Sequence, residues 1–128
     1  MAGLITHLAL SSVQIEYMVV SKKSILLAYQ MLRTMEPFAS WRLPTKIQTK
    51  VVNDPLMYGC FEDSPDTITI STAKCWSVEQ LTATVAHEMI HLYQHRLKIL
   101  DERNPHDLFF HEQARVVTVT LGFDKENF

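Results

Sequence analysis

A His-Glu-x-x-His run is the feature that most constrains how this 128-residue chain can fold. It occupies His87–His91, inside a stretch whose apolar residues recur at helical spacing. On a helix, residues four apart lie on one face, so the imidazoles of His87 and His91 can reach the same metal ion. Glu88 would stand beside that ion, where its carboxylate can accept a proton from an activated water. The pattern predicts a hydrolytic metal site. The alternative interpretation is a surface helix with two solvated histidines.

The residues around the run favour the metal site. Ser77 and Gln80 match a capping box, which predicts a helix that begins ten residues before His87. Neither glycine nor proline interrupts the chain between Ser77 and Pro105. The apolar positions cover more than one side of this helix and are Val78, Leu81, Val85, Met89, Leu92, Ile90, Tyr93 and Leu97. Such a helix is buried, and two histidines on it are costly unless something such as a metal ion satisfies them.

Two histidines leave catalytic zinc one protein ligand short, because such sites usually use three. His95 continues the same helical face, but it lies about 12 Å along the axis from His87, too far for one ion. The third ligand must follow a chain reversal, for which Asp101–Pro105 is a suitable loop. His106, His111 and Glu112 come after this loop and are the candidates.

These residues resemble the SprT-like zinc metallopeptidases, a family that includes the DNA–protein crosslink protease Spartan and many short phage-encoded relatives. The resemblance lies in His87–Tyr93, the polar loop, and a histidine that opens a helix with Phe110 four residues later. In the family the third zinc ligand is a histidine 19 positions after the first, and here 106 − 87 = 19. The chain reads His106-Asp107 where the family reads His-Gly or His-Asn. It also has Asn104-Pro105 where a glycine usually precedes that histidine.

The resemblance covers the C-terminal half, and the N-terminal half only in layout. It implies an α+β fold of the minimal zincin type, with a long N-terminal helix, a small and mainly antiparallel sheet, a central active-site helix, and a C-terminal helix that carries the third ligand at its start. It further implies Zn²⁺ bound by His87, His91 and His106, with Glu88 as the base that activates water for peptide hydrolysis.

Two alternatives and one open assignment accompany this interpretation. Glu112 could be the third ligand, since 112 − 91 = 21 is close to the spacing of thermolysin-type peptidases, but the joint agreement of His106 and Phe110 favours His106. The domain could also be a catalytically silent, zinc-stabilised binding or structural module. Finally, the donor that stabilises the oxyanion is open among Tyr58, Tyr93, His111 and Arg115.

The N-terminal half predicts a scaffold helix and a small sheet. Ser11 or Ser12 can cap a helix that runs to about Glu36, where Pro37 stops it, and residues 1–10 would be an extension. The sequence then becomes strand-like, with strands predicted at 46–52, 57–61 and 67–71, the last two forming a hairpin around the turn-rich segment 62–66. In zincins a sheet edge pairs with the substrate backbone, and either hairpin strand could supply it; the alternative is that both strands only complete the sheet.

Composition indicates one globular domain over residues 1–128, because 47% of the residues are hydrophobic and 20% are charged. The formal net charge is −2 and no basic cluster exceeds Lys22-Lys23, so only the family resemblance leaves nucleic-acid binding open. We expect a protein or peptide substrate and no membrane span. Cys60 and Cys75 are expected to be free thiols. We expect a cytoplasmic location, or the host cytoplasm or the virion if the protein is phage-encoded. The sequence does not predict the oligomeric state.

Overall fold

Four α-helices and a three-stranded sheet make up residues 20–128, the part of the chain that the computed structural model describes. The expected α+β fold is confirmed. In order along the chain, the elements are α2 (Lys22–Arg33), α3 (Phe38–Trp41), β1 (Gln48–Val52), β2 (Gly59–Glu62), β3 (Thr67–Ser71), α4 (Val78–Arg96), α5 (Leu108–Leu121) and the short 3-10 helix η1 (Lys125–Asn127). No helix in residues 20–128 is both long enough and apolar enough to cross a membrane.

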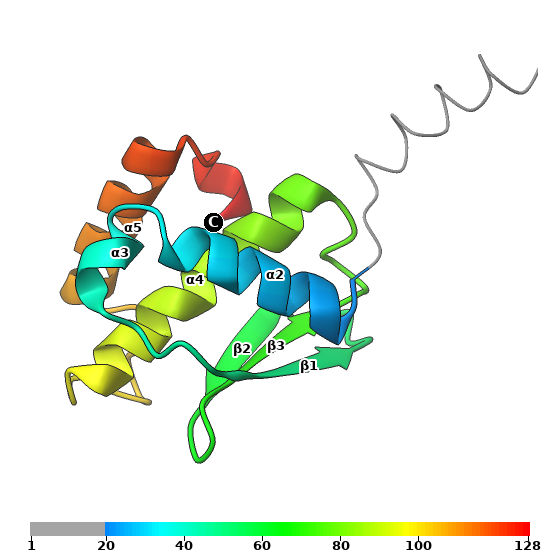
Figure 1. Cartoon of the computed structure of the whole chain (residues 1–128), viewed down its shortest axis with the longest axis horizontal. Coiled ribbons are helices and arrows are strands. Elements are labelled where there is room, and N and C mark those ends of the chain that lie inside the picture. The colour runs from blue at the N-terminus through cyan, green and yellow to red at the C-terminus, as the bar shows by residue number, and fades with distance from the viewer. Residues whose placement is uncertain (1–19) are drawn as a thin grey trace, which may run out of the picture.

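Helix α4 lies at the centre of the molecule. It contacts α2, α5, β2, β3 and η1, and α2 crosses in front of it in the view of Figure 1. The helix begins where the sequence predicts, because the Ser77 hydroxyl accepts a hydrogen bond from the Gln80 main-chain N–H at 3.0 Å. The Gln80 side chain turns to other partners and donates to Thr84 Oγ1 and to the Asn127 main-chain oxygen. Residues on several sides of α4 are buried, as its apolar pattern predicts.

The sheet has the strand order β1-β3-β2 and is mixed. Strands β2 and β3 form the expected antiparallel hairpin, whereas β1 runs parallel to β3. The expectation of a mainly antiparallel sheet is therefore wrong for β1, because the chain crosses from β1 past the central strand before it enters the hairpin. Gly59 allows β2 to pack closely against β3 and α4, since a Cβ there would lie 2.6 Å from the Thr69 main-chain oxygen and 3.0 Å from Thr84 Cγ2. Among the described strands, β2 is left with one unpaired edge.

Helix α2 begins later than the sequence interpretation placed it. Ser21 is extended, with φ −144° and ψ 166°, and caps the helix together with Ser24. A helix continuous from Ser11 or Ser12 is therefore ruled out, and those residues, like the expected extension 1–10, lie outside the described part. The helix ends at Arg33 rather than near Glu36. Its buried side chains, which face the core, are Ser24, Ile25, Ala28, Tyr29 and Leu32.

Both cysteines are free, as expected. Cys75 is fully buried, and its Sγ lies 3.4 Å from the Tyr58 main-chain oxygen and 3.3 Å from Thr84 Oγ1. Cys60 is half-buried in β2. Cys75 thus links the residue that precedes β2 to Thr84 on α4.

Candidate metal centre

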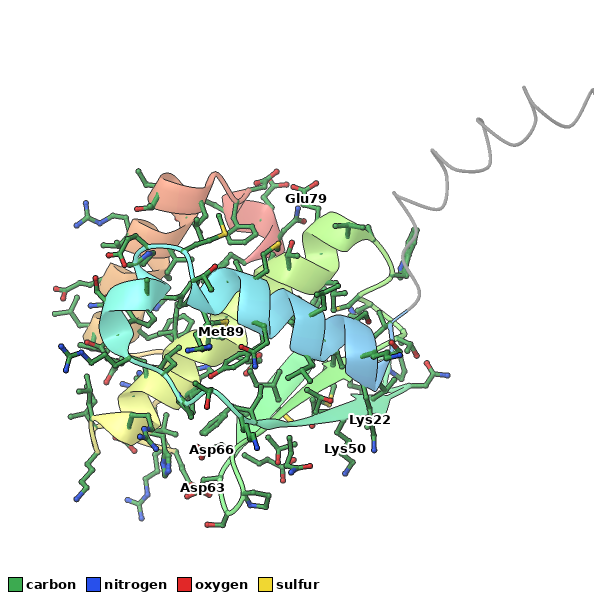
Figure 2. The ribbon with its side chains drawn as sticks, in the orientation of Figure 1. Lys22, Lys50, Asp63, Asp66, Glu79 and Met89 are labelled. Carbon is green, nitrogen blue, oxygen red and sulfur yellow. The ribbon has the colours of Figure 1, made fainter. Side chains whose placement is uncertain are left out.

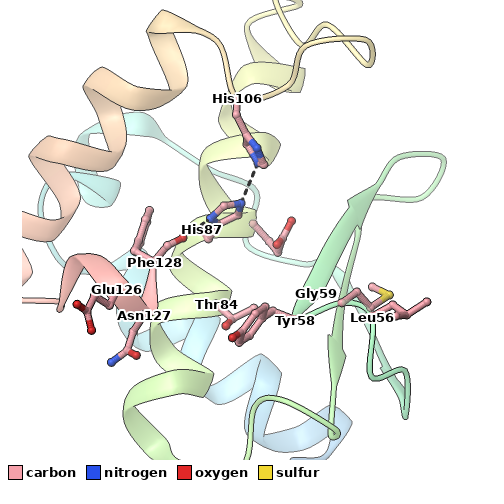
Figure 3. A pocket seen from close by; sticks show the side chains of 11 residues that line it. Leu56, Tyr58, Gly59, Thr84, His87, His106, Glu126, Asn127 and Phe128 are labelled. Carbon is pink, nitrogen blue, oxygen red and sulfur yellow. Dashed lines mark hydrogen bonds between the residues drawn. The ribbon is translucent and has the colours of Figure 1, made fainter.

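Three histidine side chains converge at the junction of α4 and α5. His87 and His91 lie one turn apart on α4, and His106 comes from the loop that precedes α5. The His106 Nε2 atom lies 3.1 Å from the Nε2 atoms of both His87 and His91. Figure 3 shows the His106 side chain pointing at that of His87, with a dashed line between them. The ligand atoms of the three residues all lie within 4.8 Å of one another.

The donor set fits a zinc ion. Imidazole nitrogens bind Zn²⁺ at about 2.0–2.1 Å, so two ligands of a tetrahedral site lie roughly 3.3 Å apart. The two nitrogen–nitrogen distances of 3.1 Å are close to this value. Three protein ligands also leave one tetrahedral position open, as in catalytic rather than structural zinc sites.

Hydrogen bonds at the outer nitrogens place lone pairs at the centre. His87 Nδ1 lies 2.8 Å from the Phe128 main-chain oxygen, and His91 Nδ1 lies 2.7 Å from Gln94 Oε1. Both oxygens can only accept, so each Nδ1 donates and each neutral ring keeps its lone pair on Nε2. Burial lowers the pKa of His87 from 6.5 to about 4, and burial also lowers the pKa of His91 and of His106. The three rings are therefore neutral at pH 7 and suited to hold a cation.

The loop before α5 brings His106 to the other two histidines without a glycine. Asp101 organises this loop by accepting hydrogen bonds from the main-chain N–H groups of Arg103 and Asn104. Lys98 has a positive φ of 61°, whereas no residue of 101–105 does, so a glycine is not required there. Asp107 caps α5 by accepting from the Phe110 N–H at 2.9 Å. Asparagine can fill the same role, which accounts for the His106-Asp107 departure.

Phe110 packs against all three histidine rings. Its ring centroid lies 4.8 Å from those of His87 and His91 and 4.6 Å from that of His106, and it stacks on His91 at an interplanar angle of 19°. The side chain is 4% exposed. The aromatic residue four positions after His106 thus forms an apolar floor that limits the movement of the three rings.

A model of the SprT-like family matches residues 23–126, which is most of the chain. The chain belongs to the SprT-like family. A search of curated proteins and a search of solved structures each returned no match. The family match extends well beyond the C-terminal half in which the motifs of this SprT-like protein lie.

Glu88 is the buried acid of the site. It follows His87 on α4 and is 4% exposed. Burial away from water raises the pKa of its carboxyl from 4.5 to about 8. Glu88 lines a cavity of about 310 Å³ together with Tyr58, Gly59, His87 and His106, and Figure 3 shows this cavity. It also lines a second cavity of about 340 Å³ along β2.

The structure places the remaining candidates away from the three histidines. Glu112 is exposed on α5 and is not part of the cluster, so the alternative third ligand is not brought to His87 and His91. His95 Nε2 lies 3.7 Å from a carboxylate oxygen of Asp63 and 3.9 Å from one of Asp66. Both aspartates are labelled in Figure 2 and lie in the turn of the β2–β3 hairpin. The expectation that His95 lies outside the cluster is confirmed.

Three of the four candidate oxyanion donors line cavities that border the histidine cluster, and one does not. Tyr93 stacks on Trp41, with ring centroids 4.2 Å apart, and lines none of the cavities beside Glu88. Tyr58 lines the cavity that contains Glu88. His111 and Arg115 line a third cavity of about 550 Å³, which also borders His87 and His106. Tyr58, His111 and Arg115 therefore remain.

Two residues that the sequence interpretation does not name are bonded to histidines of the cluster in this SprT-like protein. Gln94 binds His91, and the main chain of Phe128 binds His87. A polar residue three positions after His91, on a helix otherwise buried by apolar residues, is a signal for Gln94. Phe128 leaves no such signal, because a main-chain oxygen does not depend on the residue type.

Proposed function

We propose that this SprT-like protein is a zinc-dependent peptidase that cleaves peptide bonds in proteins or peptides. The observation that carries the proposal is Glu88, a buried acid adjacent to an open cluster of three histidines. A purely structural metal site would close with a fourth ligand and would gain nothing from a buried carboxyl, whose desolvation is costly. Buried acids with a raised pKa in a cleft are typical of proton-transfer chemistry.

The chain's own residues divide the work of hydrolysis. His87, His91 and His106 would hold Zn²⁺, which when bound acts as a Lewis acid toward water and a carbonyl oxygen. Glu88 would accept the proton of the attacking water and return it to the nitrogen of the leaving amine. A pKa near the working pH suits both proton transfers. A cation beside Glu88 would favour the ionised carboxylate and so lower its pKa from about 8 toward 7. Tyr58, His111 or Arg115 would stabilise the oxyanion.

Strand β2 is the element we expect to bind the substrate backbone. Its outer edge has no strand partner among the described residues, whereas β3 is paired on both sides. Gly59, Cys60 and Phe61 of β2 line the cavity that also contains Glu88 and the three histidines. An extended peptide added to this edge by main-chain hydrogen bonds would pass in front of the metal centre. This arrangement supports a protein or peptide substrate.

Two further expectations concern partners and compartment. The net charge of −2 gives no electrostatic support for nucleic-acid binding, which the family resemblance alone leaves open. The two free thiols agree with a reducing compartment, and we propose a cytoplasmic location.

The proposal is tested by comparing wild type with Glu88→Gln on a panel of unfolded proteins, with and without DNA. The amide has nearly the same shape as the carboxyl but cannot accept the water proton. We expect cleavage by Glu88→Gln to fall roughly 10²–10⁴-fold while its zinc content stays unchanged. The control is Glu112→Gln, the same change on an exposed residue of α5, which should leave cleavage unaltered. If wild type and Glu88→Gln bind zinc and are equally inert, the protein is a zinc-stabilised module instead.

A further inference from the structure

Gln94 is a fully buried amide that contacts residues on both sides of the metal centre. It lies on α4, three residues after His91, and its exposed fraction is 0%. Its side chain makes hydrogen bonds to His91, to the Pro105 main-chain oxygen and to Asp107. Pro105 and Asp107 are the two neighbours of His106. One side chain therefore connects the second histidine of the cluster with the loop that carries the third.

The oxygen of the Gln94 amide fixes the tautomer and the orientation of the His91 ring. Gln94 Oε1 lies 2.7 Å from His91 Nδ1. The orientation of the amide is fixed by its other end, because the Pro105 main-chain oxygen can only accept and must face the NH₂ group. Gln94 thus holds the proton of His91 on Nδ1 and leaves the lone pair of Nε2 directed at His106. Phe110 stacks on the same ring, so His91 is restrained both at its edge and on its face.

The nitrogen of the Gln94 amide is bonded to the residues on either side of His106. Gln94 Nε2 donates to the Pro105 oxygen at 3.0 Å and to Asp107 Oδ1 at 3.3 Å. The same Asp107 oxygen accepts from the Phe110 N–H and caps α5. The start of α5, the backbone on both sides of His106 and the ring of His91 therefore share one hydrogen-bond network with the buried Gln94 at its centre. Removing this amide would take away the partner of the buried His91 Nδ1 and the donor to the Pro105 oxygen, whereas Asp107 would keep its bond from the Phe110 N–H.

We propose that Gln94 is a positioning residue that sets two of the three histidines in register before a metal ion binds. It does so by fixing the proton of His91 on Nδ1 and by holding the main chain around His106. A site that has to be ordered by the ion itself binds that ion more weakly, since ordering the loop costs free energy. This inference rests on the metal-binding part of the proposed function and is independent of whether peptides are cleaved.

The test compares Gln94→Met with a matched control. Methionine has nearly the same length and volume as glutamine but neither accepts from His91 nor donates to Pro105. The control is Gln30→Met, because Gln30 on α2 also accepts from one side chain, Arg33, and donates to one loop carbonyl, that of Thr45, and neither partner is a histidine of the cluster or a sequence neighbour of one. Zinc affinity is measured for the full chain by competition with a chromophoric chelator. We expect a 10–100-fold loss of affinity for Gln94→Met and less than about a threefold change for Gln30→Met.

A second measurement separates positioning from general stability. In zinc-loaded wild type, nitrogen-15 NMR should show the Nδ1 proton of His91 as a slowly exchanging resonance, because it is buried and bonded to Gln94. In Gln94→Met this proton should exchange at least tenfold faster, whereas Gln30→Met should keep it as in wild type. The wild-type spectrum alone can overturn the proposal, even if Gln94→Met does not fold: a fast-exchanging Nδ1 proton on His91 would contradict it.

The remaining outcomes are also decisive. If Gln94→Met binds zinc as tightly as Gln30→Met and differs only in melting temperature, Gln94 is a packing residue and the inference is wrong. If wild type binds no zinc, the proposed function and this inference both fail. If wild type binds zinc and Gln94→Met binds it weakly but neither cleaves any substrate, the inference stands and the peptidase proposal fails.

Discussion

At the scale of the residue, the titration of Glu88 is where burial and chemistry meet. Its pKa is raised to about 8 because the carboxylate would be poorly solvated beside the core. The same burial lowers the pKa of the neighbouring His87 to about 4. Without metal, the site is therefore built to be uncharged at neutral pH. A divalent cation would reverse this preference for Glu88 and favour its ionised form.

The stability of the metal-free protein should consequently depend on pH through Glu88. The folded state retains this proton up to about pH 8, whereas the unfolded chain releases it near pH 4.5, so stability falls as pH rises between these values. The variant Glu88→Gln lacks this ionisation. In the presence of a chelator, we expect its melting temperature to exceed that of wild type by an amount that grows with pH across this window.

Thermal melts of the two proteins at a series of pH values provide the measurement. His87 destabilises the folded state in the opposite direction, as pH falls, but it does so equally in both proteins. Repeating the melts with zinc is the control, because the cation should make the difference nearly independent of pH. A constant difference without metal would show that Glu88 is not desolvated as described.

At the scale of the element, the orientation of the histidines on α4 depends on the segments that pack against this helix. The helix supplies two histidines. His91 is bonded to Gln94 of the same helix, which is itself bonded to the loop before α5. His87 is bonded to the segment that follows α5. That last segment is attached to α4 at further points. Gln80 Nε2 donates to the Asn127 oxygen and Asn127 Nδ2 donates to Glu79 Oε1, both at 3.0 Å. Helix η1 thus presents the Phe128 oxygen to His87.

Removal of residues 125–128 should therefore weaken metal binding. The deletion takes away the acceptor for His87 Nδ1, and losses of this kind typically cost 10–100-fold in affinity. The matched variant is Phe128→Ala, which keeps the main-chain oxygen and removes only the ring that lies 5.6 Å from the His87 ring. We expect chelator competition to show a clearly smaller loss for Phe128→Ala. Equal affinities for the deletion and wild type would exclude a role for η1 at the site.

At the scale of the whole molecule, the sequence predicts what depends on local pattern. The start of α4 follows from Ser77 and the apolar period, and the hairpin follows from strand-like segments around a turn. The pairing of β1 with β3 is a long-range contact with no local signal, so its parallel direction was missed. The start of α2 differs from the prediction because Ser21, which has the same residue type as the predicted caps, is itself extended and caps the helix.

The candidate site divides in the same way. The convergence of His87, His91 and His106 could be anticipated because residue type and spacing carry it. The groups that orient these histidines could not, since one is a main-chain oxygen and the other is an amide whose partners come from another element. A spacing rule could not exclude Glu112 either. Its exposure follows from the register of α5, which Asp107 sets through its cap.

The central claim is that three histidines from two parts of the chain bind one zinc ion. Elemental analysis of protein purified without added zinc tests it most directly. We expect about one zinc per chain in wild type, none in His87→Ala or His91→Ala, and a strongly reduced content in His106→Ala. Glu112→Ala should retain the wild-type content. Wild type without zinc, or loss of zinc in Glu112→Ala but not in His106→Ala, would contradict the account.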